Sequence, residues 1–148
     1  MANEALSSSG TLLAVSAALP ATYDSAGYAA LTWTNVFGVV DIPSYGSNKE
    51  VMTITYLADA ITQKAGGPVD MGAVNVQMGY LETDPGQNIL QAAALPSAAN
   101  IACRVTYPSG KRDYFVALVS TYLKNISGAA SFQLAESMLN ITTAIVEV

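Results

Sequence analysis

Apolar and polar residues alternate along several stretches of the chain, and this period-two pattern constrains the fold more than any other feature. Residues 74–80 read Val-Asn-Val-Gln-Met-Gly-Tyr, and residues 101–107 read Ile-Ala-Cys-Arg-Val-Thr-Tyr. Successive side chains of a β-strand point to opposite faces of its sheet. Each stretch therefore predicts a strand that buries one face.

Further stretches extend this β-rich pattern. Residues 114–123 are apolar on both faces, so we expect a strand that is covered on both sides, with Leu118 buried between two layers. Residues 36–40 and 51–57 are shorter strand candidates. Residues 131–148 predict two strand segments, and their apolar phase changes between Met138 and Leu139, which predicts a bulge or a bend.

One helix interrupts the strands. Asp84 can serve as its N-cap, Pro85 suits the first helical position, and Gln87 has the spacing of a capping box. An apolar face follows, and Pro96 ends the segment. We therefore predict a mainly β fold, a β-sandwich or barrel, with one flanking α-helix at about residues 85–95.

The length of 148 residues fits a single domain spanning 1–148. Within it, residues 1–10 are small and polar and predict a flexible N-terminal arm. Residues 59–72 contain Gly66, Gly67 and Pro68 and predict a long flexible loop. Loops of this length in compact domains are usually functional or disordered.

Charged residues are scarce. They make up 11% of the chain, against roughly 25% in an ordinary soluble domain, while apolar residues make up 51%. Six basic and eleven acidic side chains cannot densely cover the surface of a small monomer. We therefore expect a subunit that buries surface against its own copies. An exterior rich in Ser, Thr, Asn and Gln is the alternative.

The sequence lacks the residue types that most often carry catalysis or bind zinc. The chain has no histidine and a single cysteine, Cys103, which excludes the usual catalytic triads and a zinc site based on Cys or His. The carboxylates are scattered, and no phosphate-binding loop is present. We predict no enzyme, no catalytic residue, no metal and no cofactor.

The net charge and the hydropathy of the chain argue against nucleic acid and membranes as binding partners. The net charge of −5 argues against a protein that grips nucleic acid. Residues 11–18 are apolar, but they lack a preceding basic region and are too short to span a bilayer. We expect no targeting signal and no membrane anchor.

The aromatic residues Tyr23, Tyr28 and Trp33 have no Lys or Arg between them, so packing or a protein interface explains them better than base stacking.

Several motifs, taken in order, resemble one family. They are Pro20–Asp24, Gly27–Trp33, Asp84–Gln87, Arg104–Gly110 and Ile145–Val148. Together they resemble the lambda-like siphophage major tail tube proteins over nearly the whole chain after about residue 10. The order and spacing carry the resemblance, because each motif alone is weak.

The resemblance implies a structural subunit of a phage tail. It implies hexameric rings whose inner strands join into one barrel, stacked into a hollow tube around a tape measure protein. The implied partners are further copies, the tape measure protein, and the tail terminator and tail-tip proteins. Double-stranded DNA would pass through a typically acidic lumen without specific binding. The protein would belong to the virion tail, after synthesis and assembly in the host cytoplasm.

The resemblance also implies where subunits touch. The arm and the long loop would contact neighbouring rings. The apolar residues after the arm are expected to dock as a strand on a neighbour. Relatives often carry a basic run where this chain has Ala65–Pro68, so apolar or backbone contacts are expected there instead of salt bridges. The predicted inter-subunit residues are Leu12, Leu13, Val15, Lys64, Gly67, Pro68 and Asp70.

Two alternatives stay open at this point. One is another ring-forming component, such as a phage tail terminator or a ring protein of a secretion tube. The other is a β-sandwich adhesin or binding module. An adhesin is expected to carry a secretory signal, which this sequence lacks.

Overall fold

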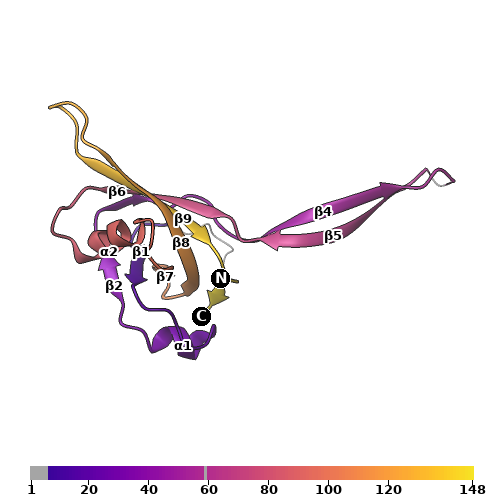
Figure 1. Cartoon of the computed structure of the whole chain (residues 1–148), viewed down its shortest axis with the longest axis horizontal. Helices are drawn as coiled ribbons and strands as arrows, with labels where there is room; N and C mark the ends of the chain where they lie inside the picture. Colours follow the sequence, from indigo (N-terminus) through magenta and orange to yellow (C-terminus); the bar gives the residue numbers. More distant parts are fainter. Residues whose placement is uncertain (1–6, 59) are drawn as a thin grey trace.

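Ten strands and two short helices make up residues 7–58 and 60–148, the part of the chain that the computed structural model describes (Figure 1). The predicted mainly β fold with a flanking helix is confirmed. The strands are β1 (Leu12–Ser16), β2 (Thr34–Val36), β3 (Val39–Asp41), β4 (Asn48–Thr55), β5 (Thr62–Asp70), β6 (Ala73–Gly79), β7 (Ile101–Thr106), β8 (Arg112–Asn125), β9 (Leu134–Ile141) and β10 (Val146–Glu147). The helices are α1 (Ser25–Ala29) and α2 (Pro85–Ala93).

The main sheet curls back on itself. Its strand order is β2-β1-β7-β8-β9-β6-β3, with β10 paired to β8, and its described pairings are antiparallel. β2 and β3 stand at opposite ends of this order, yet only Phe37 and Gly38 separate them in sequence. The two ends of the sheet must therefore lie next to each other, which gives a barrel-like body.

Gly38 makes this junction possible. Its φ is +80°, a left-handed conformation that favours glycine, and its carbonyl accepts a hydrogen bond of 2.7 Å from the Gly79 N–H. Residues 36–40 therefore form the ends of two strands and not the single strand that their composition predicts. β2 pairs with β1, and β3 pairs with β6.

The core lies inside the curled sheet. It is built from the inward side chains of the strands and from one face of α2, including Val15, Val76, Leu90, Phe115 and Leu139, each at most 1% exposed. The alternation in residues 74–79 is confirmed, because Val74, Val76 and Met78 are buried.

A second apolar layer covers the outer face of β7 and the first half of β8. Tyr28 of α1 is fully buried and stacks on Tyr114, with ring centroids 5.1 Å apart. Trp33 packs on the same ring at 5.7 Å, and Arg104 lies over Trp33 at 5.1 Å. Packing is thus the role of Tyr28 and Trp33, while Tyr23 is 57% exposed.

The double coverage of β8 ends halfway along the strand. Tyr114, Val116 and the side chains between them are buried, as predicted. Leu118, however, is 44% exposed, so its expected burial between two layers is wrong. The α1 segment covers the outer face only as far as Val116, and β7 pairs with β8 only as far as Ala117.

The N-terminal segment differs from expectation. β1 lies between β2 and β7, and Leu13 and Val15 are 2% and 0% exposed in the core of their own chain. The expectation that they dock as a strand on a neighbour is therefore wrong. Their backbone groups pair with β2 and β7, and their side chains are buried in the core of their own chain. Leu12 is 49% exposed. Of the arm predicted at 1–10, residues 1–6 lie outside the described residues.

The C-terminal segment shows where the phase change comes from. β9 is one strand without a bulge, and its inward and outward faces are both apolar around Met138 and Leu139. The bulge lies instead in the partner strand, between Val119 and Thr121. The two predicted strand segments exist as β9 and β10, but the break falls between Ile141 and Val146.

Helix α2 begins as predicted and is tied to the sheet junction. The Asp84 carboxylate accepts the Gln87 N–H at 3.0 Å, which confirms the N-cap. The Gln87 side chain does not complete a capping box. Its amide instead accepts the Leu81 N–H at 3.0 Å and donates to the carbonyls of Phe37 and Gly79, both at 2.8 Å. One buried amide thus joins α2, β6 and the β2–β3 junction.

Replacing Gln87 with Leu should destabilise the fold by at least about 3 kcal/mol, because three backbone groups lose a partner at a site that is 1% exposed. Urea unfolding of dilute protein measures this loss. The control is Gln91→Leu on the exposed side of the same helix, expected within about 0.5 kcal/mol of the parent. Equal stability of the two variants would contradict the role given to Gln87.

Candidate functional site

The hairpin β4–β5 projects away from the body as a separate two-stranded sheet (Figure 1). Nearly every residue of its two strands is exposed. A two-stranded hairpin without a third strand or a covering layer is at best marginally stable in water. This projection is therefore the first candidate for a surface that another molecule covers.

One face of the hairpin is apolar. The register pairs Met52 with Ala65 and Ile54 with Gln63, so these side chains share a face. Met52 and Ile54 are 52% and 54% exposed. The opposite face is more polar, since Thr53 pairs with Lys64 and Thr55 with Thr62. An exposed apolar strip of this kind marks an interaction surface.

The predicted long loop at 59–72 is wrong as a description of its structure. Residues 62–70 form strand β5, while Asp59 lies outside the described residues. Gly67 and Pro68 fall at a register shift, where two residues of β5 stand opposite Glu50. A proline is tolerated in an edge strand or at a bulge. The Gly- and Pro-containing sequence therefore permits a strand here.

The predicted contact residues lie in two different places. Lys64, Pro68 and Asp70 are exposed along β5, and Gly67 is partly exposed there, so all four share the projecting hairpin. The Asp70 carboxylate accepts the Gly72 N–H at 2.9 Å and shapes the base of the hairpin. Their contact with neighbouring subunits stays a prediction, and so does that of Leu12.

A second projection was not predicted. β8 and β9 extend together beyond the body, in a direction away from β4–β5 (Figure 1). Leu123, Ile126 and Phe132 on this arm are 53%, 49% and 89% exposed. The signal in the sequence was the continued apolar composition after Leu118. That composition predicts a buried strand, because composition alone does not say whether a covering layer reaches that far.

Open strand edges occur on the hairpin and on the far half of β8. β4 pairs only with β5 in the described part of the chain. On β8, the edge that β7 occupies up to Ala117 has no described strand beside it from Leu118 to Asn125. An unpaired edge presents free N–H and C=O groups and is a template for pairing with another chain. The described part of the chain therefore offers such edges in both sheets, along the β4–β5 hairpin and along β8 of the main sheet.

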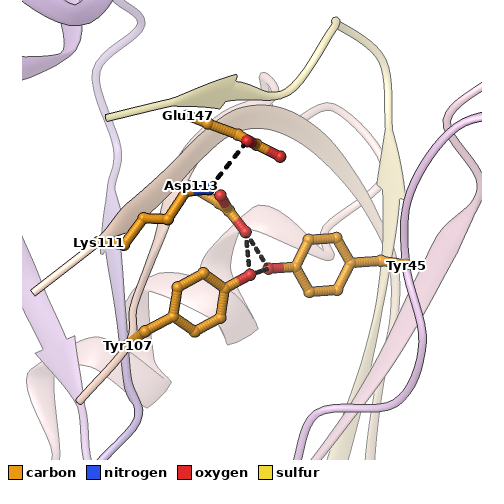
Figure 2. Close-up of polar contacts among 5 residues, drawn as sticks. All are labelled: Tyr45, Tyr107, Lys111, Asp113 and Glu147. Carbon is orange, nitrogen blue, oxygen red and sulfur yellow. Dashed lines mark hydrogen bonds and ion pairs between the residues drawn. The ribbon is translucent and has the colours of Figure 1, made fainter. Parts of the chain in front are cut away.

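A buried polar cluster holds the base of the hairpin (Figure 2). Asp113 at the start of β8 is 4% exposed. Its Oδ2 accepts hydrogen bonds from the hydroxyls of Tyr45, at 2.6 Å, and Tyr107. The two hydroxyls lie 2.8 Å apart. Tyr45 lies between β3 and β4, so this cluster ties the root of the projection to β7 and β8.

The surroundings of Tyr45 and Tyr107 keep both phenol groups protonated. Burial, together with the hydrogen bond to Asp113, raises the pKa of Tyr45 well above its ordinary value, and burial raises the pKa of Tyr107 as well. Both phenols therefore stay protonated and act as donors at neutral pH. Nearby, Lys111 Nζ and Glu147 Oε2 form an exposed ion pair at 3.1 Å.

The described residues hold no arrangement typical of catalysis. No group of three or more His, Cys, Asp or Glu side chains that could bind a metal occurs among them. Burial raises the pKa of the Cys103 thiol to about 12, so this cysteine is not a ready nucleophile at neutral pH. Within residues 7–58 and 60–148, no helix has the length and apolar character needed to cross a bilayer.

Comparisons with known proteins point to one kind of protein. A family model described as phage tail tube protein, TTP, matches residues 3–142. Among solved structures, the chain is similar to one in the cryo-EM structure of the anti-feeding prophage baseplate, 6-fold symmetrised, with a TM-score of 0.68 and 11% sequence identity. The match covers 100% of this chain and 97% of that chain, and at this identity it shows a shared fold. No sequence among the curated proteins matches.

Tyr45→Phe should lower the free energy of unfolding by about 1.5–3 kcal/mol, because it removes a donor from a buried carboxylate. Thermal or urea unfolding measures the loss. Tyr23→Phe is the matched control, since Tyr23 is 57% exposed, and it should change stability by less than about 0.5 kcal/mol. If both variants unfold at the same urea concentration, the cluster does not anchor the hairpin.

Proposed function

Since the chain belongs to the family of phage tail tube proteins, we propose that its copies close into hexameric rings and that these rings stack into a hollow tube. The family model confirms the resemblance seen in the sequence. The protein is a structural subunit of a phage tail, and tail tube proteins assemble with themselves and with other tail components. The number of subunits in a ring and the stacking of rings are the parts of this proposal that go beyond the match to the family.

The open edges support ring closure. β4, in the separate β4–β5 sheet, is eight residues long, and the free edge of β8 covers residues 118–125. The two edges differ, so a contact between them is heterologous, and a repeated heterologous contact closes into a ring if its rotation allows. The solved structure with the similar fold is a 6-fold symmetrised assembly, which supports six copies.

The projecting hairpin supports stacking. It carries the apolar strip of Met52 and Ile54 outside the body, where no described residue covers it. The stretch Ala65–Pro68 carries no charge, which favours apolar and backbone contacts over salt bridges between rings at that part of the hairpin. Lys64, Gly67, Pro68 and Asp70 lie along the same hairpin and would reach the neighbouring ring with it.

The family resemblance supplies the remaining parts of the proposal. The tube would form around a tape measure protein, end at tail terminator and tail-tip proteins, and later conduct double-stranded DNA into the host. Synthesis and assembly would take place in the host cytoplasm. The chain would act without enzymatic chemistry, a cofactor or a membrane anchor.

Electron microscopy and sedimentation of the purified protein test the proposal. Long hollow tubes are the expected result. Single rings would favour a terminator-like component, and subunits that stay dispersed at high concentration would refute self-assembly.

The double variant Met52→Asp with Ile54→Asp should keep its fold and lose tube growth. Both side chains are exposed, so unfolding should change by less than about 1 kcal/mol. The concentration needed for assembly should rise at least about 30-fold, the equivalent of about 2 kcal/mol at an interface hot spot.

The control is Tyr23→Asp, which adds one carboxylate, against two in the double variant, at an exposed aromatic residue before α1, and it should assemble as the parent does. Normal tube growth by the double variant would show that the hairpin does not join rings.

A further inference from the structure

The β8–β9 arm ends in a loop that carries no charge. Residues 126–133 read Ile-Ser-Gly-Ala-Ala-Ser-Phe-Gln, and we call this loop the tip. Its two large apolar side chains, Ile126 and Phe132, are 49% and 89% exposed. Aromatic side chains are enriched at protein interfaces, and an exposed apolar group at the end of a projection marks an interaction surface.

The backbone of the tip has a defined shape. Ser127 has a φ of +41°, in the left-handed region that residues other than glycine seldom adopt, and the Ser131 N–H donates to the Gly128 carbonyl at 3.0 Å. The Tyr80 N–H donates to the Gln133 carbonyl at 3.0 Å and ties the loop to the end of β6. A loop held in this way loses less conformational freedom on binding than an unstructured one.

A groove lies at the other end of β8. Its volume is about 1050 Å³, and its walls are residues 7–11, residues 39–42, and the end of β7 with the turn into β8. Val40, Val105 and Pro108 give it apolar surface, and Val40 is 70% exposed. The two charged residues of the lining, Asp41 and Lys111, have opposite signs. The groove is therefore largely apolar and has no net charge.

Strand β3 gives one wall of the groove free backbone groups. It pairs with β6 along one edge, and no strand in the described part of the chain pairs with its other edge. Unpaired N–H and C=O groups of an edge strand can bond to a chain that enters beside them. The groove thus offers both apolar side chains and backbone hydrogen bonds to an incoming segment.

The tip and the groove stand at opposite ends of one strand. β8 begins at Arg112, next to the groove residue Lys111, and ends at Asn125, where the tip begins. Its 14 residues span roughly 45 Å along the strand. Figure 1 shows the end of the arm on one side of the molecule and the C-terminus, whose Val148 pairs with Arg112, on the other. A tip that fills a groove must therefore come from a second copy.

Ring closure indicates which copy supplies the tip. Paired strands of a sheet lie side by side, so copies joined along the free edge of β8 follow one another sideways around the ring. β8 then runs from one rim of the ring to the other. All tips project at one rim, and all grooves open at the opposite rim. Rings stacked in the same direction bring tips against grooves, and this heterologous contact repeats without closing.

We propose that the tip of one copy docks in the groove of a copy in the next ring, with Phe132 against Val40 and Pro108. The proposal rests on the proposed tube function and adds a contact between rings that is separate from the β4–β5 hairpin. The charges fit, because the tip has none and those of Asp41 and Lys111 balance each other.

Cross-linking of assembled tubes tests the contact. Ser131→Cys places a thiol on the tip, and Ser109→Cys places one in the lining of the groove. Both changes replace a hydroxyl with a thiol at an exposed site, so both variants should assemble as the parent does. The native Cys103 is fully buried and should not react. Tubes grown from an equal mixture of the two variants are treated with a short bismaleimide.

The control mixture pairs Ser131→Cys with Ser97→Cys, the same substitution at an exposed site after α2 that does not line the groove. Thiols held side by side react at a high effective concentration, so the tip–groove mixture should give at least about tenfold more linked chains than the control. Dispersed subunits of the two mixtures should not differ.

Tubes that form normally without this cross-link would overturn the proposal and leave the groove to residues 1–6 of the chain or to another protein. An equal yield from the control mixture would overturn it as well. If the parent forms neither rings nor tubes, the proposed function itself fails, and electron microscopy of the parent distinguishes that result.

Removal of the apolar side chains tests their contribution. Ile126→Ser with Phe132→Ser should leave the fold intact, because both side chains are exposed, and urea unfolding of dilute protein checks this. Single rings should still form, while the protein concentration needed for tube growth should rise at least about tenfold. Sedimentation and electron microscopy separate rings from tubes.

The matched control is Leu19→Ser with Leu95→Ser, which removes two exposed apolar side chains outside the tip and the groove. It should form tubes at the concentration that the parent requires. Normal tube growth by the tip variant would contradict the proposal, and so would the loss of single rings together with the tubes, because the tip would then act within a ring.

Discussion

The closure of the sheet is the constraint on which the rest of the structure depends. β2 and β3 occupy the two ends of a seven-strand path, and two residues join them, so the sheet must curl until its ends meet. Gly38 supplies the left-handed turn, and the buried amide of Gln87 satisfies the backbone at the junction. With the body closed in this way, β4, β5 and the far half of β8 have no place inside it.

What lies outside the body explains the unusual composition. A chain with 11% charged residues leaves apolar side chains on two projections, the β4–β5 hairpin and the β8–β9 arm. Here the open edges and apolar strips are what a polymerising subunit needs. The cluster around Asp113 holds the root of one projection at a fixed place on the body.

Part of the candidate site could be predicted from the sequence. The family resemblance predicts a contact surface that includes Lys64, Gly67, Pro68 and Asp70. The structure places these four residues on one projecting hairpin, in a strand where the sequence predicts a loop, and their contact with other subunits stays a prediction. Nothing in their own pattern indicated β5, because no core faces the hairpin to impose alternation. The cluster of Tyr45, Tyr107 and Asp113 was missed, since its members are brought together across distant segments of the chain.

The sequence by itself determined the strands at residues 74–79 and 101–106, where α2 begins, and that the chain has no histidine and a single cysteine. These properties depend on local periodicity, capping and residue type, and they need no knowledge of neighbours. Only the tertiary structure decided that Val15 lies in its own core and that Leu118 is exposed. Coverage of a strand depends on which distant layer reaches it, and a period-two pattern does not encode that reach.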